Sequence, residues 1–135
     1  MSEENVELVR RCVAALDRED YEVARSCFEE EAEWNNTATF PGPRTVLGAG
    51  AIVEFWQDLN ESFRRGSQGG TRIEDIRASK DRVVVALHTR GRGAASGAPI
   101  DVDYALTVSV RDGMIRRVDV SGDYSRALGA AGLSE

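Results

Sequence analysis

The sequence predicts one α+β domain, with helices in the first half of the chain and an antiparallel sheet in the second half. Three observations support this. The chain has 135 residues, which is enough for one hydrophobic core and too few for two. Apolar residues recur at helical spacing in the first half, and from residue 71 on they alternate as in strands. We therefore treat residues 1–135 as a single domain.

Composition and charge exclude several kinds of partner. There are 17 basic and 23 acidic residues, and the resulting net charge of -6 repels phosphate backbones, so we expect no nucleic-acid partner. No apolar run is long enough for a membrane helix, and the first residues are acidic where a signal peptide is basic. We expect no membrane partner and a cytoplasmic location. With His88 as the single histidine, we also predict no metal and no cofactor.

Apolar residues at helical spacing predict three helices before residue 70. The first follows Ser2 and runs to about Asp17. Asp20 can cap a second, shorter helix, which should stop at the acidic run 29–31 because negative charge is unfavourable at the C-terminal end of a helix. The third helix has the clearest signal, a wide apolar stripe that consists of Ile52, Phe55, Trp56, Leu59 and Phe63.

Strands are expected after the second helix and again from residue 71. A short strand should cover residues 32–34, and turn-forming residues follow it. Asp112 and Gly113 are typical of a type I′ hairpin turn, which needs a positive φ at both positions. The second half should be a four-strand antiparallel meander, with strands at about 71–78, 82–92, 100–111 and 114–121.

Four stretches of sequence carry a resemblance to a known family. They are ENVELVRRCVAALDREDYEVARSCFEEEAEW, LHTRGRGAASGAPIDVDYAL, VRDGMIRRVDV and DYSRALGAAGL. Together with the order of elements, they resemble the SnoaL-like branch of the nuclear-transport-factor-2 superfamily, to which ketosteroid-isomerase-like and polyketide-cyclase-like proteins belong. The resemblance implies a curved sheet that wraps around the helices to form a cone with an apolar cavity, and it implies that dimers are common. It does not imply one chemistry, because members include enzymes and ligand binders.

Two catalytic sets known from such relatives are not complete here. Ketosteroid isomerases use a carboxylate base and an oxyanion hole made by a tyrosine and a protonated aspartate. The corresponding positions hold Cys12, Asn36 and Leu106. Asn36 cannot accept a proton and Leu106 cannot donate a hydrogen bond, so this route is not expected. Relatives that open limonene epoxide place an arginine and an aspartate two residues apart, where this chain has Leu87 and Thr89.

Asp119 is the candidate acid or base that remains. A two-residue turn would place Leu106 opposite Asp119 and Tyr104 opposite Ser121. Since Leu106 lies on the apolar face, Asp119 and Ser121 should point inward, where burial raises the pKa of a carboxyl group. Two alternatives stay open: Asp119 pairs with Arg117 or lies in water at the cavity mouth, and a bulge in either strand would turn it outward.

The remaining candidates are pocket residues and one histidine. His88 shares a face with alternate residues that point away from the helices, so we interpret it as a structural or interface histidine. The cysteines are interpreted as core residues. The residues expected to line the pocket are Cys12, Trp34, Asn36, Phe55, Trp56, Tyr104, Leu106 and Ser121.

Two functional hypotheses follow. The first is a pocket protein for a small hydrophobic molecule, apolar, ring-containing or polyketide-like, with isomerase, cyclase or hydratase chemistry at Asp119. The alternative is a non-catalytic ligand-binding or dimerisation module of the same fold. In either case we expect a homodimer through the outer face of the sheet, where close packing is possible at Ala105, Thr107, Val118 and Val120.

Overall fold

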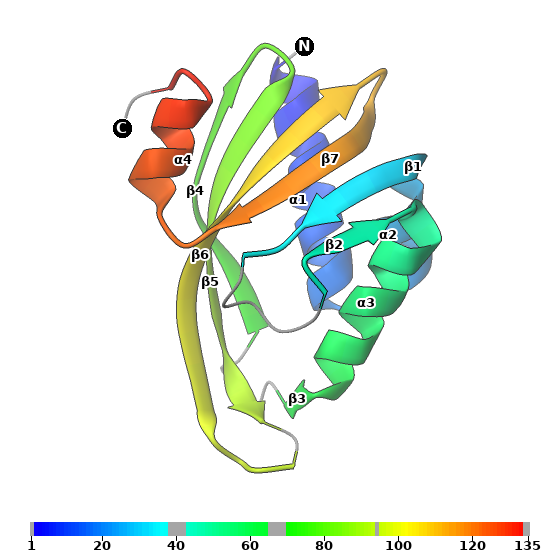
Figure 1. Cartoon of the computed structure of the whole chain (residues 1–135), viewed down its shortest axis with the longest axis vertical. Coiled ribbons are helices and arrows are strands. Elements are labelled where there is room, and N and C mark those ends of the chain that lie inside the picture. The colour runs from blue at the N-terminus through cyan, green and yellow to red at the C-terminus, as the bar shows by residue number, and fades with distance from the viewer. Residues whose placement is uncertain (1, 38–42, 65–69, 94, 134–135) are drawn as a thin grey trace.

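The computed structural model describes residues 2–37, 43–64, 70–93 and 95–133. These residues form four helices and a seven-stranded, curved sheet, so the predicted α+β class is confirmed (Figure 1). The helices are α1 (Ser2–Asp17), α2 (Tyr21–Ser26), α3 (Ala49–Glu61) and α4 (Tyr124–Ala130). The strands are β1 (Phe28–Asn35), β2 (Thr45–Leu47), β3 (Phe63–Arg64), β4 (Gly70–Ser79), β5 (Arg82–Gly93), β6 (Pro99–Arg111) and β7 (Met114–Ser121).

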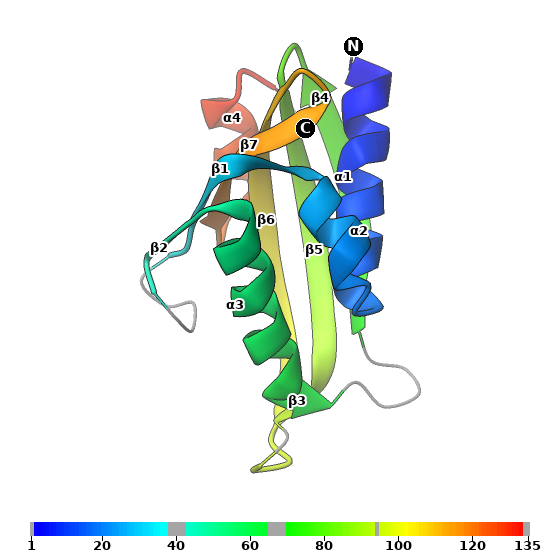
Figure 2. The same cartoon turned by 90° about the vertical axis from the view of Figure 1, so that its right-hand side faces the viewer.

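The sheet has an inner and an outer face. Its order is β2-β1-β7-β6-β5-β3, and β4 also pairs with β5. From β4 to β7 every pair is antiparallel, as predicted, whereas β1 lies parallel to β7. The helices α1, α2 and α3 cover the inner face, and α4 lies against the outer face (Figure 2). The main core lies between the first three helices and the inner face.

The first helix confirms the sequence prediction, whereas the second and third helices end earlier than expected. The first ends at Asp17, and the side chain of Asp20 caps the second by accepting a hydrogen bond from the Val23 N–H at 3.4 Å. That second helix ends at Ser26, so the acidic run 29–31 lies in β1 and not at a helix end. The run extends the strand predicted at 32–34, in which Phe28, Ala32 and Trp34 are buried and residues 29–31 are partly or fully exposed. Phe63, which the apolar stripe assigns to the third helix, lies instead in β3, where it pairs with Gly93 of β5.

The hairpin between β6 and β7 contains the main departure from the prediction. The φ angles of Asp112 and Gly113 are 53° and 76°, as a type I′ turn requires. The register then shifts by one residue at a β-bulge, so that Thr107 and not Leu106 lies opposite Asp119. Consequently Asp119 points to the outer face and the expected register is wrong beyond the bulge. The shift lets Val118 bury its side chain, which is 1% exposed, in the main core.

The outer face is partly covered within the chain itself. Ala127 and Leu128 of α4 pack on Val84 and Ala105 in a second apolar cluster. Val118 and Val120 lie on the inner side with the main core. The predicted dimer surface is therefore wrong in these positions, because Ala105 is covered by α4 and the two valines face inward. Thr107 remains on the outer side.

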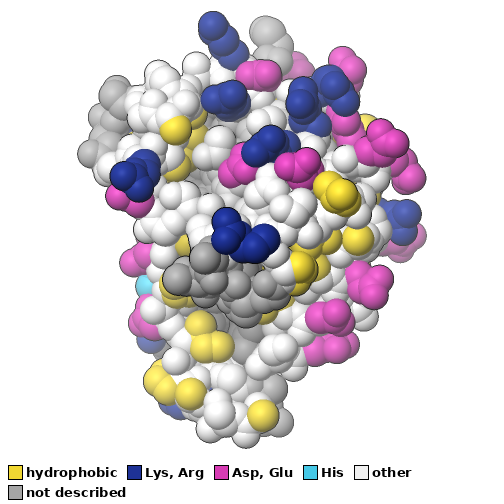
Figure 3. All heavy atoms as spheres, viewed as in Figure 1, with side chains coloured by type: hydrophobic (Ala, Val, Ile, Leu, Met, Phe, Trp, Pro, Cys, Tyr) yellow, Lys and Arg dark blue, Asp and Glu magenta, His cyan; other side chains and the backbone are white. Residues whose placement is uncertain are grey.

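Charged side chains of both signs are interspersed over the face of the molecule in Figure 3, on the residues that the structure describes. This agrees with the absence of a basic stripe in the sequence. Within the described ranges, no helix is long and apolar enough to cross a membrane.

Candidate functional site

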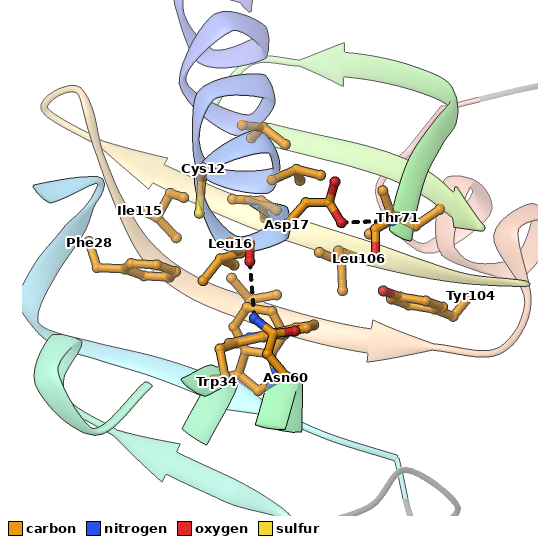
Figure 4. Close-up of a pocket in the computed structure, with 16 residues that line it drawn as sticks. Cys12, Leu16, Asp17, Phe28, Trp34, Asn60, Thr71, Tyr104, Leu106 and Ile115 are labelled. Carbon is orange, nitrogen blue, oxygen red and sulfur yellow. Dashed lines mark hydrogen bonds between the residues drawn. The ribbon is translucent and has the colours of Figure 1, made fainter. Parts of the chain in front are cut away.

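A narrow pocket lies between α1, α3 and the inner face of the sheet (Figure 4). The centres of water-sized molecules can occupy about 30 Å³ of it, and the space between its atoms, open solvent included, is about 490 Å³. One wall is the apolar face of α1, which contributes valines and Leu16, and the facing wall is the sheet, which contributes Leu87, Leu106 and Val108. Aromatic rings complete the enclosure at Phe28, Trp34, Trp56 and Tyr104. The pocket is thus mainly apolar and aromatic, as small-molecule sites usually are.

Five of the residues predicted to line the pocket do so, namely Cys12, Trp34, Trp56, Tyr104 and Leu106.

The other three predicted pocket residues lie elsewhere. Asn36 is buried behind the wall, where its Oδ1 accepts a hydrogen bond from Trp34 Nε1 at 2.8 Å. Phe55 packs edge-on against Trp56, with ring centroids 6.0 Å apart. Ser121 follows the bulge to the outer face, where its hydroxyl donates to the Asp123 carbonyl.

A connected line of polar groups forms one side of the pocket. Asp17 Oδ1 accepts a hydrogen bond from the Thr71 N–H at 2.8 Å (Figure 4). The Thr71 hydroxyl lies 2.9 Å from that of Thr89, which lies 3.0 Å from the Tyr104 hydroxyl. The line therefore runs from the end of α1 across β4, β5 and β6 and provides donors and acceptors beside an apolar space.

Sequence reasoning missed three polar lining residues, Asp17, Asn60 and Thr71. The helical pattern of the sequence identifies Asp17 only as a helix end. A usable signal existed for this side of the pocket: the apolar alternation of Val83, Val85 and Leu87 continues to Thr89, which places that hydroxyl on the inner face.

Two titratable groups of the pocket have raised pKa values, for different main reasons. Burial raises the pKa of the Tyr104 hydroxyl, although hydrogen bonds with Thr89 and Thr71 oppose the shift. Hydrogen bonding with Cys27 and burial raise the pKa of the Cys12 thiol. Near neutral pH, Tyr104 therefore provides a hydroxyl that can donate, and Cys12 acts as a small apolar wall.

The two tryptophans of the chain meet in the pocket wall. Their rings lie edge to face, with centroids 5.4 Å apart and an interplanar angle of 80°. Trp34 Nε1 donates to Asn36, as described above. Trp56 Nε1, in contrast, is buried and has no hydrogen-bond partner among the described residues.

Asp119 lies on the other side of the sheet from the pocket. Its Oδ2 is 3.0 Å from Arg117 Nε, and its Oδ1 accepts a hydrogen bond from Asn35 at 3.0 Å. The side chain is 40% exposed. The predicted inward placement is therefore wrong, and the pairing with Arg117 that was left open as an alternative is present. A carboxylate in this position cannot reach a ligand in the pocket.

His88 lies on the outer face, as predicted, between two carboxylates. Its Nδ1 is 2.6 Å from Asp103 Oδ1 and its Nε2 is 2.8 Å from Asp101 Oδ1. Glu74 approaches the same cluster, and Arg72 pairs with Glu74 at 2.9 Å. Because Arg72 pairs with Glu74 and both ring nitrogens of His88 contact carboxylates, we interpret the cluster as cross-strand polar contacts that join β4, β5 and β6.

Comparison with known proteins places this geometry in a family. The sequence profile of the SnoaL-like domain matches residues 9–118. A search of functionally curated proteins finds no match.

Solved structures are similar over almost the whole chain. A proposed SnoaL-like polyketide cyclase from Jannaschia sp. CCS1 has a TM-score of 0.77 at 19% identity, covering 100% of this chain and 96% of its own. A protein with a ketosteroid isomerase-like fold from Catenulispora acidiphila, solved with trimethylamine, has a TM-score of 0.74 at 18% identity, covering 94% and 93%. A proposed polyketide cyclase from Xanthomonas campestris has a TM-score of 0.71 at 22% identity, covering 88% and 90%. At such identities these likenesses establish the fold alone.

Proposed function

Since the chain belongs to the SnoaL-like domain family, we propose that it binds an apolar, ring-containing small molecule in the pocket between α1, α3 and the sheet. The observation that carries the proposal is the composition of the wall. Apolar and aromatic side chains surround the space, and the polar groups gather on one side, from Asp17 to Tyr104. Such a division gives affinity through burial and orientation through a few hydrogen bonds.

Binding is preferred to catalysis. The positions that form the isomerase constellation in relatives hold Cys12, Asn36 and Leu106 in this chain. The acid or base expected at Asp119 lies outside the pocket. The names of similar structures, which include polyketide cyclases and a complex with trimethylamine, support a small-molecule site in this fold.

Ligand binding can be tested with the intrinsic fluorescence of the chain. Both tryptophans line the pocket, so a ligand there should change their emission. A panel of small ring compounds, with apolar, carbonyl, amine and carboxylate members, should include at least one that changes the emission saturably and raises the unfolding temperature. A ligand at about 100 times its Kd should add about 2.7 kcal/mol to the unfolding free energy.

A matched pair of substitutions locates the binding. Leu106→Phe fills the pocket and should weaken binding, whereas Leu47→Phe makes the same change at a side chain that is 66% exposed and should not. The proposal fails if no compound binds, or if both variants bind the ligand as tightly as the wild type.

A further inference from the structure

Trp56 carries a buried hydrogen-bond donor for which the described residues provide no acceptor. Its side chain is 8% exposed, and of the buried side-chain nitrogen and oxygen atoms in the part of the chain that the structure describes, Nε1 is the one without a partner. Most buried polar groups are paired, because an unpaired one loses its hydrogen bonds to water without replacement. Trp34 follows the rule through its bond to Asn36. The exception at Trp56 therefore calls for an acceptor that is not part of the described chain.

The position of Trp56 indicates where that acceptor comes from. Trp56 is one of the residues that line the pocket, and its ring packs edge to face against Trp34 and Phe55. Because the Trp56 side chain lines this pocket, a molecule that enters it is the candidate to bring an acceptor to Nε1. In such an apolar site, water competes little for the donor and the hydrogen bond is strong.

We propose that the ligand is an uncharged carbonyl compound on an apolar ring, and that Trp56 Nε1 donates a hydrogen bond to its carbonyl oxygen. This inference rests on the proposed function, because it names the chemical class of the molecule in the same pocket.

The charge of the pocket distinguishes a carbonyl from other polar groups. Among the described lining residues, Asp17 is the one with a charged side chain, and none is basic. A ligand carboxylate would be buried beside a like charge without a cation to pair with. A protonated amine has donors only, so it cannot accept the Trp56 hydrogen bond. A neutral carbonyl oxygen fits both the donor and the charge.

The test compares two ligands that differ in the carbonyl group. Isothermal titration calorimetry of the full chain is performed with the bicyclic ketone α-tetralone and with the hydrocarbon tetralin. Trp56→Phe keeps an aromatic wall and removes the donor, so it should weaken tetralone binding about five- to tenfold, as expected for one buried hydrogen bond. Tetralin has no acceptor, and its affinity should change by less than about twofold.

Trp34→Phe is the matched control. It makes the same change in the same pocket at a donor that Asn36 already occupies, so it should not alter the ratio of tetralone to tetralin affinity. Equal losses for both ligands in Trp56→Phe, or tighter binding of the amine 1-aminotetralin than of tetralone, would overturn the carbonyl assignment while leaving the binding function intact. Binding of neither compound, nor of any other ring compound in the panel, would overturn the proposed function and this inference with it.

Discussion

Asn60 joins α3 to the end of α1 through a single buried side chain. Its Nδ2 donates to the Leu16 carbonyl at 3.1 Å and to the Tyr21 hydroxyl at 3.0 Å. The Leu16 carbonyl belongs to the last turn of α1, where helix carbonyls have no partner within the helix. Asn60 therefore closes the helical end of the pocket and keeps the neighbouring Asp17 in place.

The first prediction concerns this side chain. Asn60→Ala leaves the Leu16 carbonyl without that donor and should lower the free energy of unfolding by about 1–3 kcal/mol. Gln57→Ala on the exposed side of the same helix should change it by no more than about 0.5 kcal/mol. Urea denaturation of both variants measures the difference. Equal stabilities for the two variants would show that Asn60 has no such structural role.

The second prediction follows from the outward position of Asp119. Asp119→Asn weakens a partly exposed pair with Arg117, and such pairs contribute about 0–1 kcal/mol, so the loss of stability should be within that range. Ligand affinity should stay unchanged, because the pocket lies on the other face of the sheet. Urea denaturation and fluorescence titration measure the two quantities. A large loss of affinity would mean that Asp119 does reach the ligand.

Among the secondary-structure elements, the features set by neighbouring residues are predictable from the sequence. The β-bulge in β7 is not among them. The Asp112-Gly113 turn and the Asp20 cap depend on residues close in sequence, and both are present. The β7 register depends instead on which valines pack under the helices. A signal was available: apolar positions change from the odd-numbered Ile115 to the even-numbered Val118 and Val120, which a regular strand does not allow. Because Asp119 lies between those two inward-facing valines, its side chain points to the outer face and not inward as predicted.

The helix α4 is attached to the outer face by a tyrosine as well as by apolar packing. The Tyr124 hydroxyl donates to Asp75 Oδ2 at 2.8 Å, and this hydrogen bond is the main reason that the pKa of Asp75 lies below its usual value. A lowered carboxyl pKa stabilises the folded state above the unfolded-state pKa of about 3.9, and this stabilisation is lost as the pH falls through the folded-state pKa.

The third prediction uses this pH dependence. Tyr124→Phe removes the hydrogen bond and should lower the free energy of unfolding by about 1 kcal/mol near neutral pH. The side chain of Asp75 is 42% exposed, and solvent screening keeps the effect small. The difference between variant and wild type should shrink as the pH falls below about 4, because the unfolded chain is protonated first and Asp75 of the folded wild type follows at its lower pKa. Urea denaturation across this pH range measures it, and a difference that is independent of pH would contradict the assignment.

At the scale of the whole molecule, the sheet is used on both faces. The inner face forms the pocket with α1 and α3, and the outer face holds α4 (Figures 1 and 2). This division explains why a change on the outer face need not affect binding. The homodimer expected from the sequence stays a prediction, and any such contact must use outer-face surface that α4 leaves open.

The last prediction concerns the removal of α4. A chain that ends at Gly122 exposes Val84 and Ala105, which are fully buried in the intact protein, and loses the packing of Leu128, which is 1% exposed. Exposed apolar sheet surface promotes association, so light scattering should give a larger mass for the shortened chain than for the intact one at equal concentration. Arg126→Ala, a change on the exposed side of α4, should leave the mass unchanged. The shortened chain should still bind pocket ligands, because no pocket residue comes from α4. The same number of subunits for the intact and shortened chains would mean that α4 does not protect this face.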